Sequence, residues 1–290
     1  MATKGYIVFN ITQKDEAIFK SQVEAFIDAF KQSNANLIPI DNLHALETIQ
    51  NEHDVNFILF WDKDIALMYS LMNLKIPLFN NIDAIRLCDD KAFTYAMLMK
   101  KKIATPKTIV LPLTFNKNLN QYFNEINSLL TINKISYPLI VKERCSSLGL
   151  GVYLINNELE LKDLLNDKYD KALLIQEYIN YEYGQDYRVY LVNHRVKAIV
   201  TRINKKDFRS NLEQGGEMFN IPNPSPSLLR IAIRASLAVK LDFGAVDIVK
   251  DKNNKYYVLE VNSNARTLTL DSITKQNITK SVAEYILENI

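Results

Sequence analysis

Residues Ala245–Asn264, AVDIVKDKNNKYYVLEVNSN, decide the fold of the C-terminal part of the chain. Two apolar runs rich in β-branched residues flank the pair Asn253-Asn254, and this pattern predicts a β-hairpin. Asparagine suits such a turn because it tolerates a positive φ. If the two asparagines form a two-residue turn, Asp247 and Glu260 lie directly opposite each other, with Cβ atoms about 4.5–5.5 Å apart.

Opposed carboxylates in an apolar hairpin repel each other unless a cation lies between them. Asn262 lies two residues after Glu260 and therefore shares its face of the strand. Carboxylate and amide oxygens on one face are hard ligands that suit Mg²⁺. The hairpin thus predicts a metal site at Asp247, Glu260 and Asn262. The register of the turn is assumed, so an exposed face on which solvent screens both charges is the alternative.

A glycine-rich stretch, KERCSSLGLGVYLI (Lys142–Ile155), places Gly149 and Gly151 two residues apart in a chain that has only seven glycines. The flanking runs YPLIVK and GVYLI are typical of strands. Glycine lets a backbone adopt positive φ and approach a ligand closely. The loop could therefore be a flap that covers phosphates, as glycine-rich loops do in kinases. A simple hairpin turn is the alternative.

Two further stretches carry polar side chains at strand ends. In LIQEYINYEYGQDYRVYLV (Leu174–Val192), a strand edge can offer backbone groups to a flat heterocycle, and an acid can receive ribose hydroxyls. Asp186 and Arg188 share one face of the second strand. The alternative is an ordinary strand pair with a surface ion pair.

The stretch VTRINKKDFRSNLEQGGE (Val200–Glu217) carries Arg202 and Arg209. Two forked guanidiniums suit phosphate or carboxylate, and a charged, solvated loop is the alternative. The sequence has no G-x-x-x-x-G-K-[ST], G-x-S-x-G or H-E-x-x-H motif, and its three histidines are scattered. Neither a Walker-type nucleotide site nor a catalytic triad is therefore predicted.

The composition narrows the class of protein. The 290 residues are 48% hydrophobic and 23% charged, with a net charge of +2, which suits two domains with real cores. The balanced charge gives no reason to expect nucleic-acid or membrane binding. No apolar run reaches the roughly 18 residues that span a bilayer, and the start lacks the pattern of a signal peptide. With two distant cysteines, we expect a soluble cytoplasmic protein.

Strand-like runs alternate with helical segments up to about residue 86, which predicts a parallel α/β sheet. The apolar face of the first helix is expected to carry Ile18, Val23, Phe26, Ile27 and Phe30. Beyond residue 173, short apolar runs predict antiparallel strands with one helix between them. The chain is therefore expected to be α/β, with α+β character in its C-terminal part.

The order of these motifs resembles that of the ATP-grasp ligases, and within them the RimK type of amino-acid (glutamate) ligase. The resemblance rests on NNIDAIRLCDDKAFTYAMLMKKKIATPKT, YPLIVKERCSSLGLGVYL, LIQEYI, GQDYRVYLV, DFRSNLEQGG and GAVDIV…VLEVNSN. It covers residues from about 76 to 264 and implies an N-terminal parallel α/β domain (1–86) followed by an ATP-grasp domain (87–290). That domain would comprise a flap subdomain (about 100–173) and a C-terminal subdomain (about 174–290), both α+β.

The resemblance also implies an ATP site, with a role for each matching residue. Lys91 and Lys142 would hold phosphates, the loop would be the phosphate flap, residues 177–179 would contact adenine, and Asp186 the ribose. The nucleotide-binding residues would be Lys91, Lys142, Ser146, Ser147, Gly149, Gly151, Glu177, Tyr178, Ile179, Asp186, Arg209, Ser210 and Asn211. The catalytic residues would be Arg188, Arg202 and Arg209. Two Mg²⁺ ions, with Mn²⁺ as a substitute, would be held by Asp247, Glu260 and Asn262.

The implied reaction uses ATP to join an amine to a carboxylate through an acyl phosphate. An amino acid such as glutamate would be added to a protein C-terminus or to a small carboxylate. The alternatives are an ATP-grasp ligase of a small metabolite, one of D-alanine–D-alanine type, and a nucleotide-binding module without turnover. The sequence leaves a homo-oligomer open.

Two positions depart from the pattern of the family. Glu143 follows Lys142 where proline is usual, and Ala265-Arg266 replaces a turn that commonly contains proline. Neither position supplies a metal ligand or an ATP contact. We therefore expect ATP use to be retained and Arg266 and Thr267 to influence the choice of acceptor.

Overall fold

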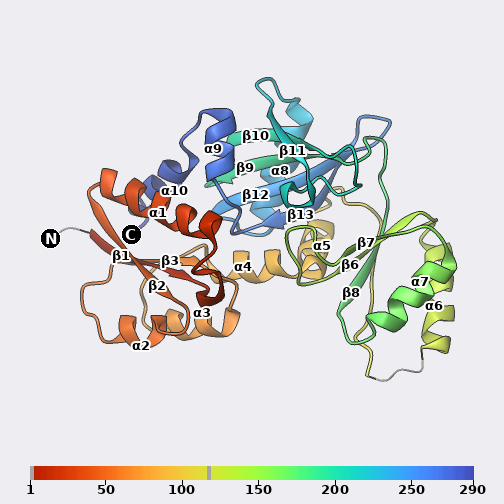
Figure 1. The fold of residues 1–290 in the computed structure, drawn as a ribbon, viewed down its shortest axis with the longest axis horizontal. Helices are drawn as coiled ribbons and strands as arrows, with labels where there is room; N and C mark the ends of the chain where they lie inside the picture. Colours follow the sequence, from red (N-terminus) through yellow and green to blue (C-terminus); the bar gives the residue numbers. More distant parts are fainter. Residues whose placement is uncertain (1–2, 116–118) are drawn as a thin grey trace.

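The computed structural model describes residues 3–115 and 119–290, which form three β-sheets with helices packed on them (Figure 1). The first sheet is parallel, in the order β2-β1-β3-β4. Its strands are β1 (Thr3–Phe9), β2 (Ala35–Asp41), β3 (Phe57–Trp61) and β4 (Leu78–Phe79). The connecting helices are α1 (Ala17–Gln32), α2 (Ala45–Gln50) and α3 (Ile65–Met72), with a short 3₁₀ turn η1 (Ile11–Gln13) before α1. The predicted parallel α/β arrangement is confirmed.

The apolar face predicted for α1 is correct except at its start. Val23, Phe26 and Phe30 are buried, but Ile18 is 63% exposed. Phe19, one residue later, takes the core position and packs on Phe9 with ring centroids 5.8 Å apart. Phe19 precedes Val23 by four residues and Phe26 by seven, so helical periodicity places it on the buried face.

The segment after this sheet forms two consecutive helices. They are α4 (Ile82–Asp89) and α5 (Lys91–Lys100). Asp90 separates them, and its side chain accepts a hydrogen bond from the Ala92 amide, as an N-cap does. The predicted domain boundary near residue 86 falls inside α4, and the division of the chain into domains stays a prediction.

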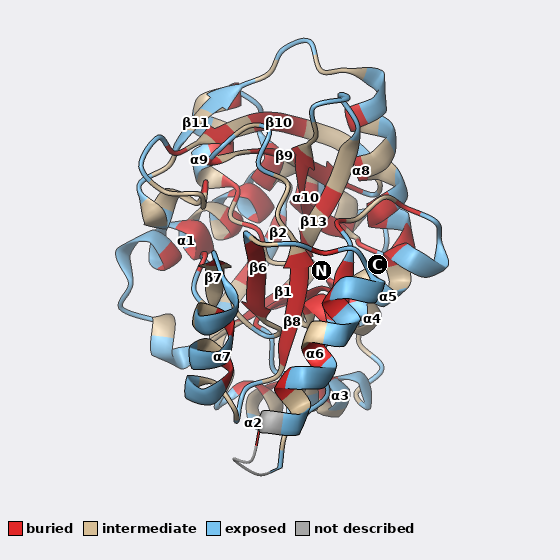
Figure 2. Cartoon of the chain, turned by 90° about the vertical axis from the view of Figure 1, so that its right-hand side faces the viewer, coloured by how far each residue is buried: buried red, intermediate tan, exposed pale blue. Residues whose placement is uncertain are grey.

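The second sheet carries the predicted flap. It is antiparallel, in the order β5-β8-β6-β7, and α6 (Asn120–Ile132) and α7 (Glu158–Asp167) pack on it (Figure 1). Its strands are β5 (Thr108–Val110), β6 (Leu139–Glu143), β7 (Val152–Ile155) and β8 (Leu173–Glu177). Lys142 pairs with Val152, so the two strands predicted to flank the flap are confirmed. In Figure 2, β6 and β8 are drawn as buried while α6 and α7 expose one side.

The third sheet has five strands in the order β11-β10-β9-β12-β13, with α8 (Pro226–Ala238) packed on it. The strands are β9 (Gln185–Val192), β10 (Arg195–Ile203), β11 (Glu217–Asn220), β12 (Phe243–Lys250) and β13 (Tyr256–Asn262). Sequence reasoning missed β11. It is a short edge strand whose residues are all at least partly exposed, so it lacks the apolar alternation that marks a strand.

The β12–β13 hairpin places Asp247 opposite Glu260 as predicted, but through a different turn. Near the turn, Lys250 pairs with Tyr256, one residue short of the register of a two-residue turn. The Asp251 carboxylate organises a longer turn by accepting hydrogen bonds from the amides of residues 253 and 255. A β-bulge next to Asp247 then restores the predicted pairing.

The C-terminal helices tie the first and third sheets together. They are α9 (Leu268–Thr274) and α10 (Ile278–Leu287), and α10 lies beside α1 (Figure 1). One apolar core joins Phe26 and Trp61 of the first region to Phe243 of β12 and Ile286 of α10. Among the described residues, no helix is long and apolar enough to cross a membrane.

Candidate functional site

One pocket opens between the second and third sheets and encloses about 860 Å³ of empty space, its solvent-filled mouth included. The flap forms one wall, strands of the third sheet form the opposite wall, and Lys91 enters from the start of α5. Most of the predicted site residues line this pocket: Lys91, Lys142, Ser146, Ser147, Gly149, Glu177, Tyr178, Ile179, Asp186, Arg202, Arg209, Ser210, Asn211, Asp247 and Glu260. Residues separated by up to 169 positions in sequence thus meet at one place.

The other three predicted residues do not line the pocket: Arg188 and Asn262 contact residues that do, and Gly151 lies between Leu150 and Val152, which line it. Arg188 binds Asp247. Asn262 donates hydrogen bonds to Asp247 and Glu260. The Gly151 carbonyl accepts a hydrogen bond from the Glu143 amide at 2.8 Å, at the base of the flap.

Two lysines bring positive charge into the pocket. Lys91 is 8% exposed and its ammonium contacts the carbonyl and hydroxyl of Ser146 in the flap. Lys142 is 7% exposed, and its ammonium has no hydrogen bond or ion pair with any described residue. Burial lowers the pKa of Lys142 to about 8, and Glu260 opposes this effect. A buried cation without a partner is costly, so the pocket favours an anionic ligand.

The flap needs its glycines for backbone geometry. Gly149 and Gly151 have φ values of 75° and 63°, a region that side chains rarely adopt. A Cβ added at Gly149 would lie 3.0 Å from Asn211 Oδ1, and one at Gly151 would lie 2.9 Å from the Glu143 side chain. The Gly149 carbonyl also accepts a hydrogen bond from Arg209. The loop thus lines a cavity and contacts the opposite wall, which favours the flap over the simple hairpin turn.

The end of β8 forms the inner rim of the pocket, with residues 176–179 lining it. The Tyr178 ring meets the Phe208 ring edge-on, with centroids 6.2 Å apart. Gln176, which sequence reasoning did not assign to the site, is 5% exposed and donates a hydrogen bond to the Thr108 hydroxyl. This rim combines backbone groups with apolar and aromatic surface, the combination that a flat heterocycle needs.

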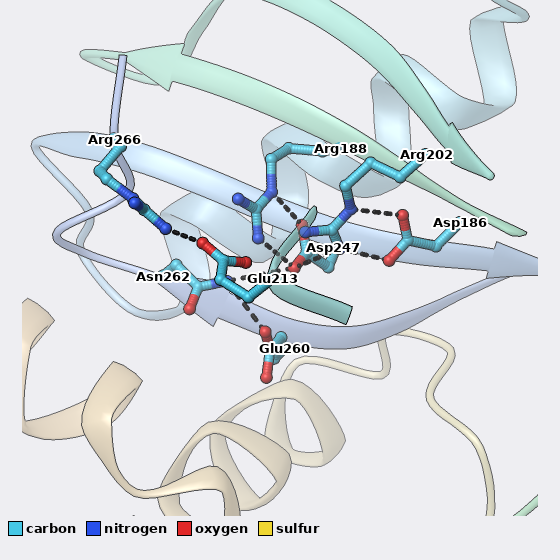
Figure 3. A network of polar contacts seen from close by, with 8 residues as sticks. All are labelled: Asp186, Arg188, Arg202, Glu213, Asp247, Glu260, Asn262 and Arg266. Atoms are coloured by element: carbon cyan, nitrogen blue, oxygen red, sulfur yellow. Dashed lines mark hydrogen bonds and ion pairs between the residues drawn. The ribbon is translucent and has the colours of Figure 1, made fainter. Parts of the chain in front are cut away.

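The opposite wall is held by a network of arginines and aspartates (Figure 3). Arg188 donates two hydrogen bonds to Asp247, at 2.7 and 2.6 Å. Arg202, 2% exposed, grips Asp186 in the same two-point manner and also contacts Asp247 at 2.9 Å. Burial would raise the pKa of Asp247, but Arg188 and Arg202 outweigh it and hold that pKa well below its usual range. Asp247 is therefore a carboxylate at neutral pH.

The predicted metal ligands converge on one point. The Asn262 amide nitrogen lies 3.3 Å from Asp247 Oδ2 and 3.1 Å from Glu260 Oε1, so a hydrogen-bond donor stands between the two carboxylates. Rotating the amide would bring its oxygen to the same place. Two carboxylates and an amide oxygen fit Mg²⁺. No cluster of three or more His, Cys, Asp or Glu suited to a metal occurs in the described part of the chain.

Sequence reasoning missed the contacts that fix the base of the flap. Arg144 binds the Asp90 carboxylate and thereby joins the flap to the start of α5. Glu143, the departure noted above, accepts a hydrogen bond from the Tyr153 hydroxyl at 2.8 Å and packs beneath Gly151. Neither pairing carries a sequence signal, because each joins residues that are brought together only by the fold.

Comparison with known proteins assigns the chain to a family. The RimK-like ATP-grasp domain family matches residues 88–286. The chain is 30% identical to the uncharacterised protein MG012 homolog of Mycoplasma pneumoniae, over 77% of each chain. It is 32% identical to the coenzyme gamma-F420-2:alpha-L-glutamate ligase of Methanocaldococcus jannaschii, over 72% of this chain and 69% of that one.

The fold also resembles that of the D-alanine–D-alanine ligase of Bacillus anthracis crystallised with ATP. The TM-score is 0.76 at 18% identity, over 99% of this chain and 97% of that one. ATP-grasp enzymes bind ATP together with a divalent metal, in agreement with the lysines and the carboxylate pair of the pocket. The chain belongs to the RimK-like ATP-grasp family and is an ATP-dependent carboxylate–amine ligase.

Proposed function

We propose that the protein adds an amino acid, with glutamate as the first candidate, to the carboxylate of a small molecule or of a protein C-terminus. The observation that carries the proposal is the meeting of two buried lysines with the Asp247, Glu260 and Asn262 set in one pocket. The glutamate ligase among the relatives supports the choice of amino acid. A cytoplasmic location belongs to the proposal because the reaction consumes ATP and both cysteines are free.

The nucleotide end of the pocket would hold ATP through groups already described. Lys91 and Lys142 would neutralise the phosphates, and the amides of the flap would cover them. The rim at residues 177–179 would contact adenine. Asp186 is the candidate for the ribose, although its carboxylate is bound by Arg202 in this structure. A ribose would therefore share that carboxylate with the arginine.

Asp247, Glu260 and Asn262 would hold Mg²⁺, with two ions expected and Mn²⁺ as a substitute. Bound there, the metal supplies positive charge beside the phosphate oxygens and so favours phosphoryl transfer. The chain's own contribution is to fix these ligands. Arg188 grips Asp247 at two points and sets the direction of its carboxylate before any ligand arrives.

The chemistry needs charge neutralisation and the exclusion of water rather than a protein nucleophile. The acceptor carboxylate attacks the γ-phosphorus, ADP leaves, and an acyl phosphate results. The amine of the amino acid then attacks the acyl carbon, loses a proton, and phosphate leaves. Arg209, Arg188 and Arg202 would stabilise charge on the transferred group. Contact between Arg209 and the Gly149 carbonyl would help to close the flap over the intermediate.

A screen of ADP release tests the proposal. The protein, ATP and Mg²⁺ are incubated with each amino acid against candidate acceptors, namely small carboxylates and peptides with a free C-terminus. The proposal expects ADP only when both substrates are present, together with a product whose mass equals the sum of the substrates less water. ADP release without an amide, or a product of two D-amino acids, would contradict it. Repeated addition would appear as a ladder of masses.

A further inference from the structure

Beside the nucleotide pocket lies an ion pair formed by two residues to which the proposed mechanism gives no role. Arg266 follows the Asn262 ligand, and its guanidinium contacts the carboxylate of Glu213. Glu213 belongs to the 3₁₀ turn η2 (Leu212–Gln214), directly after the pocket residue Asn211. The side chains are 35% and 31% exposed, so dissolved molecules can reach both. This pair bridges the loop that follows the pocket residue Asn211 and the loop that follows Asn262.

A second guanidinium lies close to this pair. Arg188 uses its Nε and one terminal nitrogen on Asp247, and its other terminal nitrogen has no partner among the described residues. In Figure 3 the Glu213 carboxylate lies on the side of Arg266 that faces Arg188. Burial and the nearby charge of Arg188 lower the pKa of Arg266, which places the two cations within electrostatic reach. Two guanidiniums that lie near each other attract a carboxylate, and in this structure the chain's own Glu213 supplies that carboxylate.

The backbone next to Arg266 is anchored by buried hydrogen bonds. The Gln22 side chain, 1% exposed, accepts a hydrogen bond from the Thr267 amide at 2.8 Å and donates one to its hydroxyl at 2.9 Å. Thr267 is itself fully buried. Glu213 lies on the short turn η2, in which its neighbours Leu212 and Gln214 are half-buried while its own side chain is 31% exposed. Rotation of the partly exposed Glu213 side chain can therefore free the Arg266 guanidinium without any movement of the anchored backbone.

We infer that Arg266 and Arg188 form a subsite for a carboxylate of the incoming amino acid, and that Glu213 occupies this subsite until the substrate displaces it. The inference rests on the proposed function, because it places this substrate beside the acyl phosphate. The subsite adjoins the Asn262–Asp247 contact, so a carboxylate held there keeps its amine near the metal set. It would select amino acids over simple amines. Arg266 is accordingly a specificity-determining residue.

Opposite effects of the two partners distinguish this subsite from a structural ion pair. Arg266→Gln removes a binding cation, whereas Glu213→Gln removes an internal competitor. We expect Arg266→Gln to raise the Kd and KM for L-glutamate about tenfold or more, and Glu213→Gln to lower both several-fold. The KM for ATP should be unchanged in both. A structural pair would make both substitutions act in the same direction.

The experiment combines calorimetry of L-glutamate binding in the presence of Mg²⁺-ADP with steady-state ADP release. The diamide of L-glutamate, which keeps the amine and loses both charges, should bind wild type and Arg266→Gln equally. Lys280→Gln, which breaks the exposed Lys280–Glu284 pair on α10, is the matched control and should change nothing.

Opposite shifts in binding without any amide product would refute the proposed function and leave the subsite standing. Normal amide formation with both variants shifted in the same direction, or not at all, would overturn the subsite. So would a failure of wild type to bind L-glutamate. An effect of Arg266→Gln on the KM of the carboxylate acceptor alone would also overturn it.

Discussion

The two walls of the pocket are built on opposite principles. The flap wall consists of serines and glycines, with Gly149 and Gly151 at positive φ, and its Leu150 is 62% exposed. The sheet wall consists of buried side chains, where Arg202 and Asp247 are 2% and 1% exposed and bind each other. Few buried contacts allow a segment to open locally, whereas an interlocked network resists it. One wall is suited to closing over phosphates, and the other to holding fixed charges against them.

The largest expected effect is on the sheet wall. Glu260→Gln preserves the size of the side chain and removes one of the two charges facing the metal position. Turnover should fall by about a thousandfold or more, while the melting temperature stays within a few degrees of wild type. ADP release and thermal unfolding on one sample measure both. Glu284→Gln, an exposed surface change, is the control. Near-normal turnover in folded Glu260→Gln would remove Glu260 from the metal set.

A second test concerns the fork of Arg202. Arg202→Lys keeps the charge but cannot grip Asp186 at two points. We expect amide formation to fall about a hundredfold, with ATP and Mg²⁺ still bound in calorimetry. Loss of stability is expected too, because the pair is buried. If the variant loses ATP binding but forms product normally per bound nucleotide, Arg202 is a nucleotide clamp.

Substitutions in the flap should have a smaller effect, and they should change the KM for ATP rather than turnover. Gly149→Val and Gly151→Val place a branched side chain at a positive φ and against Asn211 or Glu143. The KM for ATP should rise about tenfold through poorer closure. If the loop is only a turn, the free energy of unfolding should fall while the KM for ATP in the folded fraction stays at the wild-type value.

The smallest expected effect is the pH dependence of stability caused by Lys142. Its pKa is about 8 in the folded protein and 10.5 ordinarily, so between these values only the unfolded chain binds the proton. The stability of the ATP-free wild type relative to Lys142→Met should therefore rise as the pH increases from about 8 to 10. Urea unfolding at several pH values measures the difference. A difference independent of pH would mean that Lys142 is not desolvated.

These contrasts also explain what the sequence could predict. Local sequence patterns correctly predicted the parallel sheet, the strands of the flap and the position of Asp247 opposite Glu260. The two-residue turn predicted for that hairpin was wrong, because the Asp251 side chain stabilises a longer turn. A β-bulge next to Asp247 then restores the predicted pairing. The ion pairs joining Arg202 to Asp186, or Arg266 to Glu213, have no local pattern, since strand pairing and loop packing alone bring them together. The strands of both walls could therefore be predicted, while the ion pairs that hold each wall, Arg144–Asp90 at the flap and Arg202–Asp186 in the sheet, required the structure.

The most direct test of the account follows the oxygen atoms of the acceptor. The acceptor carboxylate is labelled with ¹⁸O, and the inorganic phosphate released during amide formation is analysed by mass spectrometry. An acyl phosphate leaves with one oxygen of the former carboxylate, so the account predicts one ¹⁸O in each phosphate and one in each amide product. Amide formation with unlabelled phosphate would show that the carboxylate is activated in another way, and would contradict the account.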